Sequence, residues 1–277
     1  MSLSYRANLI LYYQNPKLND MILPLSNLKG KGELILHFAI MNIKIRYKGT
    51  RLGLLWTVLE PTLTFILLYI VFTTIRLRGE NFAIYLLSGI FIYHIFSRGT
   101  YGGLLSLRGN RNVLQSMYID REFFVSASTL TTTLLMLVEI AVLFALFPFF
   151  EYVPPFTIIF LPLVILMLLA LIQGFTYFLA IINVFYKDIQ PLWGVVLHAA
   201  FFVTPIIWYV NDVSGVLLDF HRVNPIGQLV ELGHKLIVFG QIPPINDWLY
   251  AAAFVVGIFF VGFLVFKKYQ DRIVEEL

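Results

Sequence analysis

The stretch "RYKGTRLGLLWTVLEPTL", residues 46–63, decides the fold because its character changes halfway along. Its first half carries four polar or cationic residues, Arg46, Lys48, Thr50 and Arg51. An almost unbroken apolar run follows and continues to Ile75, interrupted by a single acid, Glu60. Because a helix needs about 20 mostly apolar residues to span a bilayer, the stretch predicts a polar segment feeding directly into a transmembrane helix.

The composition of the whole chain supports a membrane protein. Of its 277 residues, 59% are hydrophobic and only 13% are charged, against about 25% charged in an average soluble domain. The absence of cysteine excludes disulfides, thiolate metal sites and cysteine nucleophiles. The net charge of +4 is modest and does not suggest a nucleic-acid partner.

Apolar runs of spanning length predict an all-α integral membrane protein with one transmembrane domain over residues 1–277. Six segments qualify as spans: 54–75, 82–104, 123–149, 156–182, 191–210 and 247–266. In the fifth of them, Pro205 is expected to kink the helix.

The distribution of basic residues predicts the orientation of these spans. With the N-terminus inside, the cytoplasmic stretches hold 15 Lys or Arg residues and the outer stretches hold 4. Lys and Arg accumulate in cytoplasmic loops, so we expect both termini in the cytoplasm of a multi-pass protein of the cell (inner or plasma) membrane.

An amphipathic segment precedes the first span. Apolar residues recur at helical spacing in 33–50, and they are Leu34, Ile35, Phe38, Met41 and Ile45. Basic residues follow them, which favours an interfacial helix; a cytoplasmic packing helix is the alternative. Gly49 and Gly53 are expected to let the chain turn into the first span.

Two loops are expected to have structure of their own. The inner loop 109–122 mixes apolar and charged residues, which suggests a short helix that docks a soluble partner; a plain connector is the alternative. The outer stretch 211–246 has too many apolar residues for a solvated loop. It predicts a re-entrant or interfacial helical hairpin between the fifth and sixth spans, bounded by Pro225 and Pro243-Pro244.

Motifs for chemistry are missing from the chain. It has no G-x-x-x-x-G-K-[ST] phosphate loop, so it should not hydrolyse ATP itself. It also lacks the H-E-x-x-H and G-x-S-x-G motifs, and its five histidines have no metal-ligand spacing. We therefore expect no catalytic residues, no metal and no cofactor on this chain. His94 and Arg98 lie four apart on one helix face but do not define a site.

Three motifs in register resemble the membrane subunits of polysaccharide-exporting ABC transporters, the type-2 permease group of O-antigen, capsular-polysaccharide and teichoic-acid exporters. The first is the quoted stretch 46–63. "INVFYKDIQPLW" resembles the short loop between their fourth and fifth spans, and "FFVTPIIW" followed by "NPIGQLVE" resembles the entry to their outer re-entrant segment. The chain differs at Glu60, where many members have Gln.

The resemblance implies a half-transporter that exports a lipid-linked polysaccharide. A second copy of the chain would complete a channel, and two separate ATPase subunits, carrying ATP and Mg, would bind beneath. The interfacial helix and the 109–122 loop would contact the ATPase. The candidate coupling residues are Val113, Leu114, Met117, Tyr118, Arg121 and Glu122.

Aromatic side chains, 16% of the chain, are candidates to line a glycan channel because sugar rings stack on aromatic rings. The candidates on the first and fifth spans are Phe65, Tyr69, Phe72, Phe201, Phe202, Trp208 and Tyr209. Ordinary packing within the bundle is the alternative.

Three charges lie within predicted spans: Glu60, Arg98 and Glu139. Glu60 and Arg98 are each about 9 Å of helix rise from the inner boundary on consecutive antiparallel helices. We expect them to form an ion pair or to line one wet cavity, because an unpaired charge at this depth is unfavourable. Glu139 is the rival partner for Arg98, and a Glu60 that snorkels to the interface is the alternative.

Two other functions compatible with the residues stay open. An ABC exporter of small hydrophobic molecules shares the six-span plan, and an integral-membrane enzyme without an ATPase partner is the third possibility.

Overall fold

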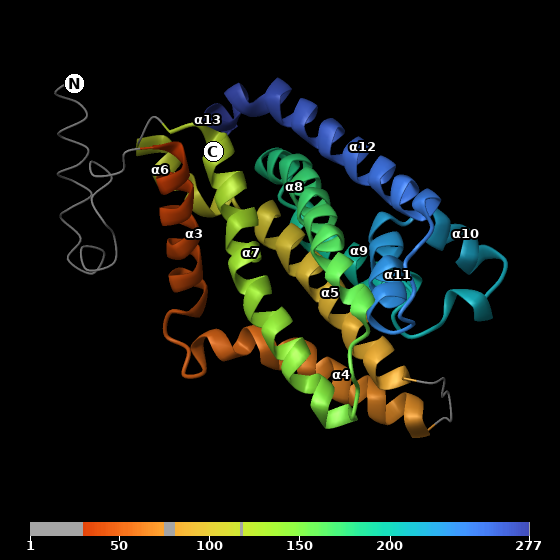
Figure 1. Cartoon of the computed structure of the whole chain (residues 1–277). Helices are drawn as coiled ribbons and strands as arrows, with labels where there is room; N and C mark the ends of the chain where they lie inside the picture. Colours follow the sequence, from red (N-terminus) through yellow and green to blue (C-terminus); the bar gives the residue numbers. More distant parts are fainter. Residues whose placement is uncertain (1–29, 75–80, 117–118, 277) are drawn as a thin grey trace.

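The computed structural model describes residues 30–74, 81–116 and 119–276, and these residues form a bundle of α-helices without strands (Figure 1). Five helical segments in this part of the chain are long and apolar enough to cross a membrane. They are Gly53–Thr74, Phe82–Leu104, Arg121–Phe150, Phe156–Phe185 and Ile245–Arg272. Five of the six predicted spans therefore correspond to helices of spanning length.

Helix α5 (Phe82–Leu104) is the central element of the bundle. In its most apolar window 78% of the residues are buried, compared with 17% in the first candidate span. It carries the polar residues Ser88, Arg98 and Thr100 among its apolar ones, and polar side chains within a span face the interior of the bundle rather than lipid. Helices α4, α7, α8, α9 and α11 all pack against it.

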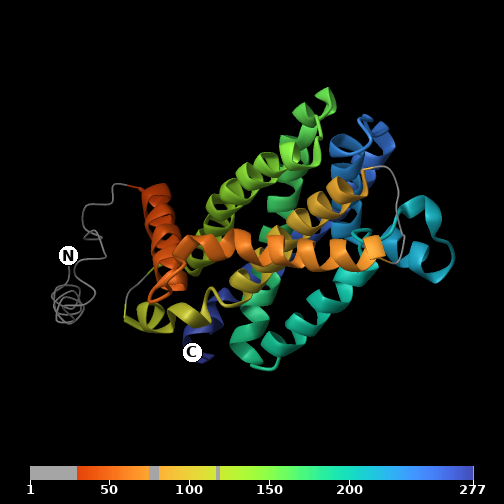
Figure 2. The same cartoon turned by 90° about the horizontal axis from the view of Figure 1, so that it is seen from below.

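Helix α4 (Trp56–Thr74) runs antiparallel to α5, with the Phe72 and Phe82 rings 6.1 Å apart near one end. A one-turn helix, η2 (Gly53–Leu55), precedes it. Most of the apolar side chains of α4 are not covered by other helices, and Leu67, for example, is 65% exposed. Figure 2 shows α4 crossing the near face of the molecule with no helix in front of it.

Helix α3 (Lys31–Tyr47) confirms the helix predicted before the first span. Phe38 and Met41 are buried against α7, where the Phe38 and Phe124 rings lie 4.9 Å apart, but Ile45 is exposed. Its interfacial location stays a prediction. Gly49 and Gly53 both have positive φ, at +79° and +50°, so the elbow uses backbone conformations that favour glycine.

The chain then forms two long helices. Helix α7 (Arg121–Leu146) continues into η4 (Phe147–Phe150), and η5 (Phe156–Phe160) leads into α8 (Leu161–Phe185). Helix α12 (Ile245–Tyr269) packs along α8 and is followed by η7 (Gln270–Arg272) and α13 (Ile273–Glu276).

The predicted fifth span, 191–210, is wrong in extent. Helix α9 covers only Ile189–Val203, 15 residues, or about 22 Å at 1.5 Å per residue, against a hydrocarbon core of about 30 Å. Thr204 is already extended, at φ −83° and ψ 138°. A residue before proline disfavours the helical conformation, so Pro205 follows the end of α9 instead of kinking it.

The stretch predicted as an outer hairpin contains the one-turn helix η6 (Val210–Asp212) and two longer helices, α10 (Val216–Val223) and α11 (Pro225–Ile237). Helix α11 is packed among α5, α8 and α12, and Leu229, Val230 and Leu236 are fully buried. The apolar residues that argued against a solvated loop therefore belong to the core, except Phe239, which is exposed. A re-entrant position in the membrane stays a prediction.

The two ends of the bundle differ (Figure 1). Helices η3 (Arg108–Asn110) and α6 (Arg111–Ser116) lie at the same end as α13, and α10 and α11 lie towards the other. We refer to these as the α6 end and the α10 end. By the distribution of basic residues, the α6 end is expected in the cytoplasm.

Helices α8 and α12 approach closely at two glycines. A Cβ added to Gly174 would lie 2.7 Å from the Phe259 Cα, and one added to Gly262 would lie 3.0 Å from the Gly174 carbonyl carbon. Real Cβ atoms do not approach backbone this closely, so the two helices are in backbone contact there. Gly257, which is also on α12, has open space around it.

We predict that Gly174→Ala and Gly262→Ala each lower the apparent Tm of the purified protein, because α12 must move away from α8. Gly257→Ala, the matched control, should leave the Tm unchanged or raise it slightly. Thermal denaturation followed by size-exclusion chromatography measures all three. Equal Tm values for the three variants would contradict the backbone contact.

Candidate functional site

An ionic cluster lies between helices α4, α5 and α7. Arg98 of α5 forms an ion pair with Glu139 of α7, whose side chain is completely buried. His94, one turn from Arg98 on α5, places Nδ1 3.5 Å from the same carboxylate and Nε2 3.4 Å from the Glu60 carboxylate. The cluster therefore connects Glu60 to Arg98 through His94 and Glu139.

The predicted direct Glu60–Arg98 ion pair is wrong, and the rival partner Glu139 takes its place. Gly99, the neighbour of Arg98 on α5, packs opposite Thr132 of α7. Glu139 is seven residues further along α7 than Thr132, so about 10 Å of helix rise separates Glu139 from the level of Arg98. Both side chains are long, and helical side chains lean towards their own N-terminus. Because α5 and α7 are antiparallel, Arg98 and Glu139 lean towards each other and close this distance.

Burial explains why Glu139 takes the arginine. The side chain of Glu139 is 0% exposed, and a buried carboxylate without a partner is strongly unfavourable. Glu60 is 69% exposed on α4 and can be stabilised from outside the protomer. A wet cavity shared by Glu60 and Arg98 stays a prediction.

His94 is the residue that sequence reasoning did not include in the cluster. Its position four residues before Arg98 was the available signal. A neutral imidazole donates one N–H and can therefore serve one carboxylate, whereas a protonated ring donates to both. The side chain is 13% exposed, so His94 marks where the buried interior of the bundle meets the open face of α4.

The predicted channel aromatics divide into buried and exposed groups. Phe65 is 5% exposed and packs within the protomer against Phe150, so in this structure it matches the alternative of ordinary bundle packing. Tyr69 and Phe72 are half-buried against the same core. On α9, Phe202 is 61% exposed, while Phe201 packs against Tyr93 with ring centres 5.4 Å apart.

The last two aromatic candidates, Trp208 and Tyr209, follow the end of α9. The Trp208 indole donates to the Phe202 carbonyl at 3.0 Å, which folds this segment back on the helix end. The Tyr209 ring lies 4.3 Å from the Tyr85 ring of α5.

The predicted coupling residues lie at the α6 end. Leu114 is buried within the protomer and Val113 packs beside it. Glu122 pairs with Lys267 of α12 at 2.6 Å and accepts a hydrogen bond from Tyr177 at 3.2 Å. Arg121 is half-buried at the start of α7. Met117 and Tyr118 lie outside the described residues.

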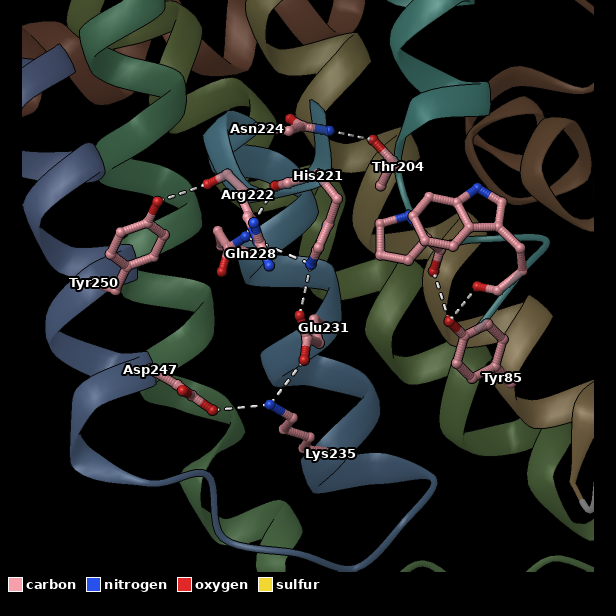
Figure 3. Close-up of polar contacts among 12 residues, drawn as sticks. Tyr85, Thr204, His221, Arg222, Asn224, Gln228, Glu231, Lys235, Asp247 and Tyr250 are labelled. Carbon is pink, nitrogen blue, oxygen red and sulfur yellow. Dashed lines mark hydrogen bonds and ion pairs between the residues drawn. The ribbon is translucent and has the colours of Figure 1, made fainter. Parts of the chain in front are cut away.

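A second polar network links the helices of the α10 end (Figure 3). Glu231 of α11 accepts from His221 of α10 at 2.7 Å and pairs with Lys235 at 2.8 Å. Lys235 also reaches Asp247 of α12 at 2.8 Å. The i,i+4 spacing of Glu231 and Lys235 was the only part of this network readable from the sequence.

The same end holds the segment after α9 in place. The Tyr85 hydroxyl donates to the carbonyls of Pro205 at 3.0 Å and Trp208 at 2.7 Å. Asn224, before α11, donates to the Thr204 hydroxyl at 3.0 Å. These bonds fix the segment that follows α9 against α5 and against the residue before α11.

We predict that Arg98→Gln and Glu139→Gln each destabilise the protein by about 3–5 kcal/mol, because each leaves a buried charge unpaired. The double variant should recover a large part of that loss. Glu60→Gln is the control and should change stability little, since its side chain is exposed. Denaturation in mild detergent measures all four, and strictly additive losses would contradict the pair.

Comparisons with known proteins identify the family. A family model described as ABC-2 type transporter matches residues 35–236. The O-antigen export system permease protein RfbA of Myxococcus xanthus is 24% identical, over 88% of this chain and 95% of the relative. The polysialic acid transport protein KpsM of Escherichia coli is 21% identical, over 84% of this chain and 92% of the relative.

The matched region extends from helix α3 to the last turn of α11 and thus includes the ionic cluster and, apart from Asp247, the polar network at the α10 end. Because the family model covers well over half of the 277 residues, this chain belongs to the ABC-2 type transporter family of membrane proteins.

Proposed function

We propose that this chain is the permease subunit of an ABC transporter that exports a lipid-linked polysaccharide across the cell membrane. Two proteins that are similar to this chain over most of its length are named as O-antigen and polysialic acid transporters, which supports this substrate class. Membership of a transporter family argues against a membrane enzyme. ATP hydrolysis is assigned to a partner subunit, since the chain has no phosphate loop.

The observation that carries the transport role is the exposed charge of Glu60 on an otherwise apolar surface. Leu63 and Leu67 share its face of α4 and are 49% and 65% exposed. A charged side chain that faces hydrocarbon at the centre of a span is unfavourable by about 2.5–3.5 kcal/mol on insertion scales, and Glu60, nearer the inner end, would bear part of that cost against lipid. This face of α4 is therefore suited to a water-containing passage rather than to lipid.

A second copy of the chain would enclose such a passage. In a single protomer the face of α4 that carries Glu60 is uncovered, so no channel closes around Glu60 within the described residues. Pairing two protomers through α4 would cover the apolar positions beside it and put the two Glu60 carboxylates on the passage. Phe202 of α9 is the exposed aromatic that we assign to the same passage.

The α6 end is the proposed ATPase-docking surface. Leu114 faces the protein interior, whereas Arg111, Asn112 and Gln115 are exposed. Arg111 therefore presents a charge to a soluble partner. Glu122 at the start of α7 pairs with Lys267 near the end of α12. Leu114 of α6 belongs to the same hydrophobic cluster as residues of α7 and α12, so a movement of α6 would be transmitted to both helices.

We predict that Leu67→Cys, introduced into a chain that has no cysteine, forms a disulfide between two copies of the permease in the membrane. Leu264→Cys on α12 is the matched control, because its exposure is 64% compared with 65% for Leu67. Non-reducing gel electrophoresis of oxidised membranes measures the product. A dimer from the control alone, or from neither, would contradict pairing through α4.

We predict that deleting the gene in its source organism removes the surface glycan and causes lipid-linked glycan to accumulate inside the cell.

Wild-type protein should restore export in the deletion strain. The variant Arg111→Glu at the α6 end should restore export less than the control Arg222→Glu, which changes an exposed arginine at the α10 end. Glycan staining and lipid extraction measure both pools. Normal surface glycan together with impaired efflux of small hydrophobic compounds would favour the alternative transporter class.

A further inference from the structure

A cavity of about 200 Å³ opens at the α10 end of the bundle. Its walls come from α5 through Tyr85, from the segment after α9 through Tyr209, and from α11 with its following turn through His234 and Phe239. It is smaller than the roughly 300–1,000 Å³ of pockets for drug-sized ligands. At about 30 Å³ per water it has room for roughly seven waters, the scale of one small polar ring.

One wall of the cavity is aromatic. The Tyr85 and Tyr209 rings are 4.3 Å apart and tilted by 46°, and Phe239 lies 6.2 Å from Tyr85 and 6.4 Å from Tyr209. The His234 ring stacks on the Tyr85 ring, with ring centres 3.7 Å apart. An apolar aromatic wall with polar edges suits a ligand that has one face of C–H bonds and a rim of hydroxyls.

Two residues that line the cavity each have a buried polar atom without a hydrogen-bond partner in the described part of the chain: Nδ1 of His234 and the hydroxyl of Tyr209. His234 is 1% exposed, and its Nε2 lies 2.9 Å from the Tyr85 carbonyl, so Nε2 carries the proton and donates. Burial lowers the pKa of His234 to about 3, so Nδ1 stays an acceptor at neutral pH. Buried polar groups without a partner are unfavourable, and hydroxyls of a ligand in the cavity would supply the missing partners.

The charges at the cavity balance one another. Lys235 and Glu231 both line it, and Lys235 is shared between Glu231 and Asp247. Burial alone would raise the pKa of Glu231, but hydrogen bonds from His221 and Lys235 hold it at about 2. Lys235, the one lysine among the described residues that line the cavity, thus already has two carboxylate partners, which disfavours a phosphate or pyrophosphate ligand. Gln241 adds an amide at the rim.

We propose that this cavity binds one neutral sugar ring of the glycan that the permease exports. The inference rests on the proposed function, and it adds a binding site inside a single protomer, separate from the passage at α4. The sugar stacks its C–H face on Tyr209 and Phe239. Its hydroxyls donate to His234 Nδ1 and bond with the Tyr209 hydroxyl and with the Glu231–Lys235 pair.

Saturation-transfer NMR on the full-length permease in lipid nanodiscs tests the proposal without a sugar-based detergent. The probes are hexoses, deoxyhexoses and N-acetylhexosamines at millimolar concentration, with inorganic pyrophosphate as competitor. We expect transfer to at least one neutral sugar. Tyr209→Phe should weaken its binding by about threefold to tenfold, because one hydrogen bond to the ligand is lost. Gln241→Ala should weaken binding in the same direction.

Tyr209→Phe is a sharp test because the hydroxyl makes no bond within the described residues, so the fold should not change. Tyr186→Phe, at the opposite end of the bundle and 68% exposed, is the matched control and should bind like wild type. Transfer to no sugar in the panel, equal binding by all variants, or displacement by pyrophosphate would each overturn the proposal. Normal export without sugar binding would reject this site alone, whereas sugar binding without an export defect on gene deletion would reject the proposed function.

Discussion

The buried ion pair between Arg98 and Glu139 constrains the whole bundle. Both groups lie in an apolar interior where either charge alone would be strongly unfavourable, so α5 and α7 must stay adjacent and in one register. That register brings His94 against the same carboxylate, and His94 in turn faces Glu60 on α4. The buried pair therefore positions α5 and α7, and His94 connects it to the exposed Glu60 of α4.

The surrounding architecture follows from how completely α5 is covered. Helices α7, α8 and α11 bury most of its surface, while α4 covers it on one side and leaves its own outer face open. The closed side of the bundle is stabilised by close helix contacts such as the one at Gly174. The outer face of α12 is nearly as open as that of α4, with 22% against 17% of the span buried. The exposed charge of Glu60 distinguishes α4 and is the reason for assigning the passage to it.

Much of the helix pattern could be predicted from the sequence, because a long apolar run is a strong signal. The predicted span 82–104 coincides with α5, and the two elbow glycines have the positive φ values expected of a sharp turn. The fifth span was overextended because hydropathy does not register a helix end. The conformational restriction before Pro205 ends α9 although the apolar residues continue to Trp208.

The sites were harder to predict, because they depend on which faces of helices meet. Helix rise alone put Arg98 level with Glu60, but side-chain length and lean decide its pairing with Glu139. The cavity at the α10 end combines Tyr85 with residues more than a hundred positions later, such as Tyr209 and His234. No local pattern in the sequence brings these residues together.

The accessibility of position 60 to water tests the account most directly. Glu60→Cys in the assembled transporter can be treated with a charged, membrane-impermeant thiol reagent and, in parallel, with a lipid-soluble maleimide. If Glu60 borders an aqueous passage, the charged reagent should label position 60 much faster than Leu264→Cys on the outer face of α12. Labelling of position 60 by the lipid-soluble maleimide alone would contradict the account, because the α4 face would then lie against lipid.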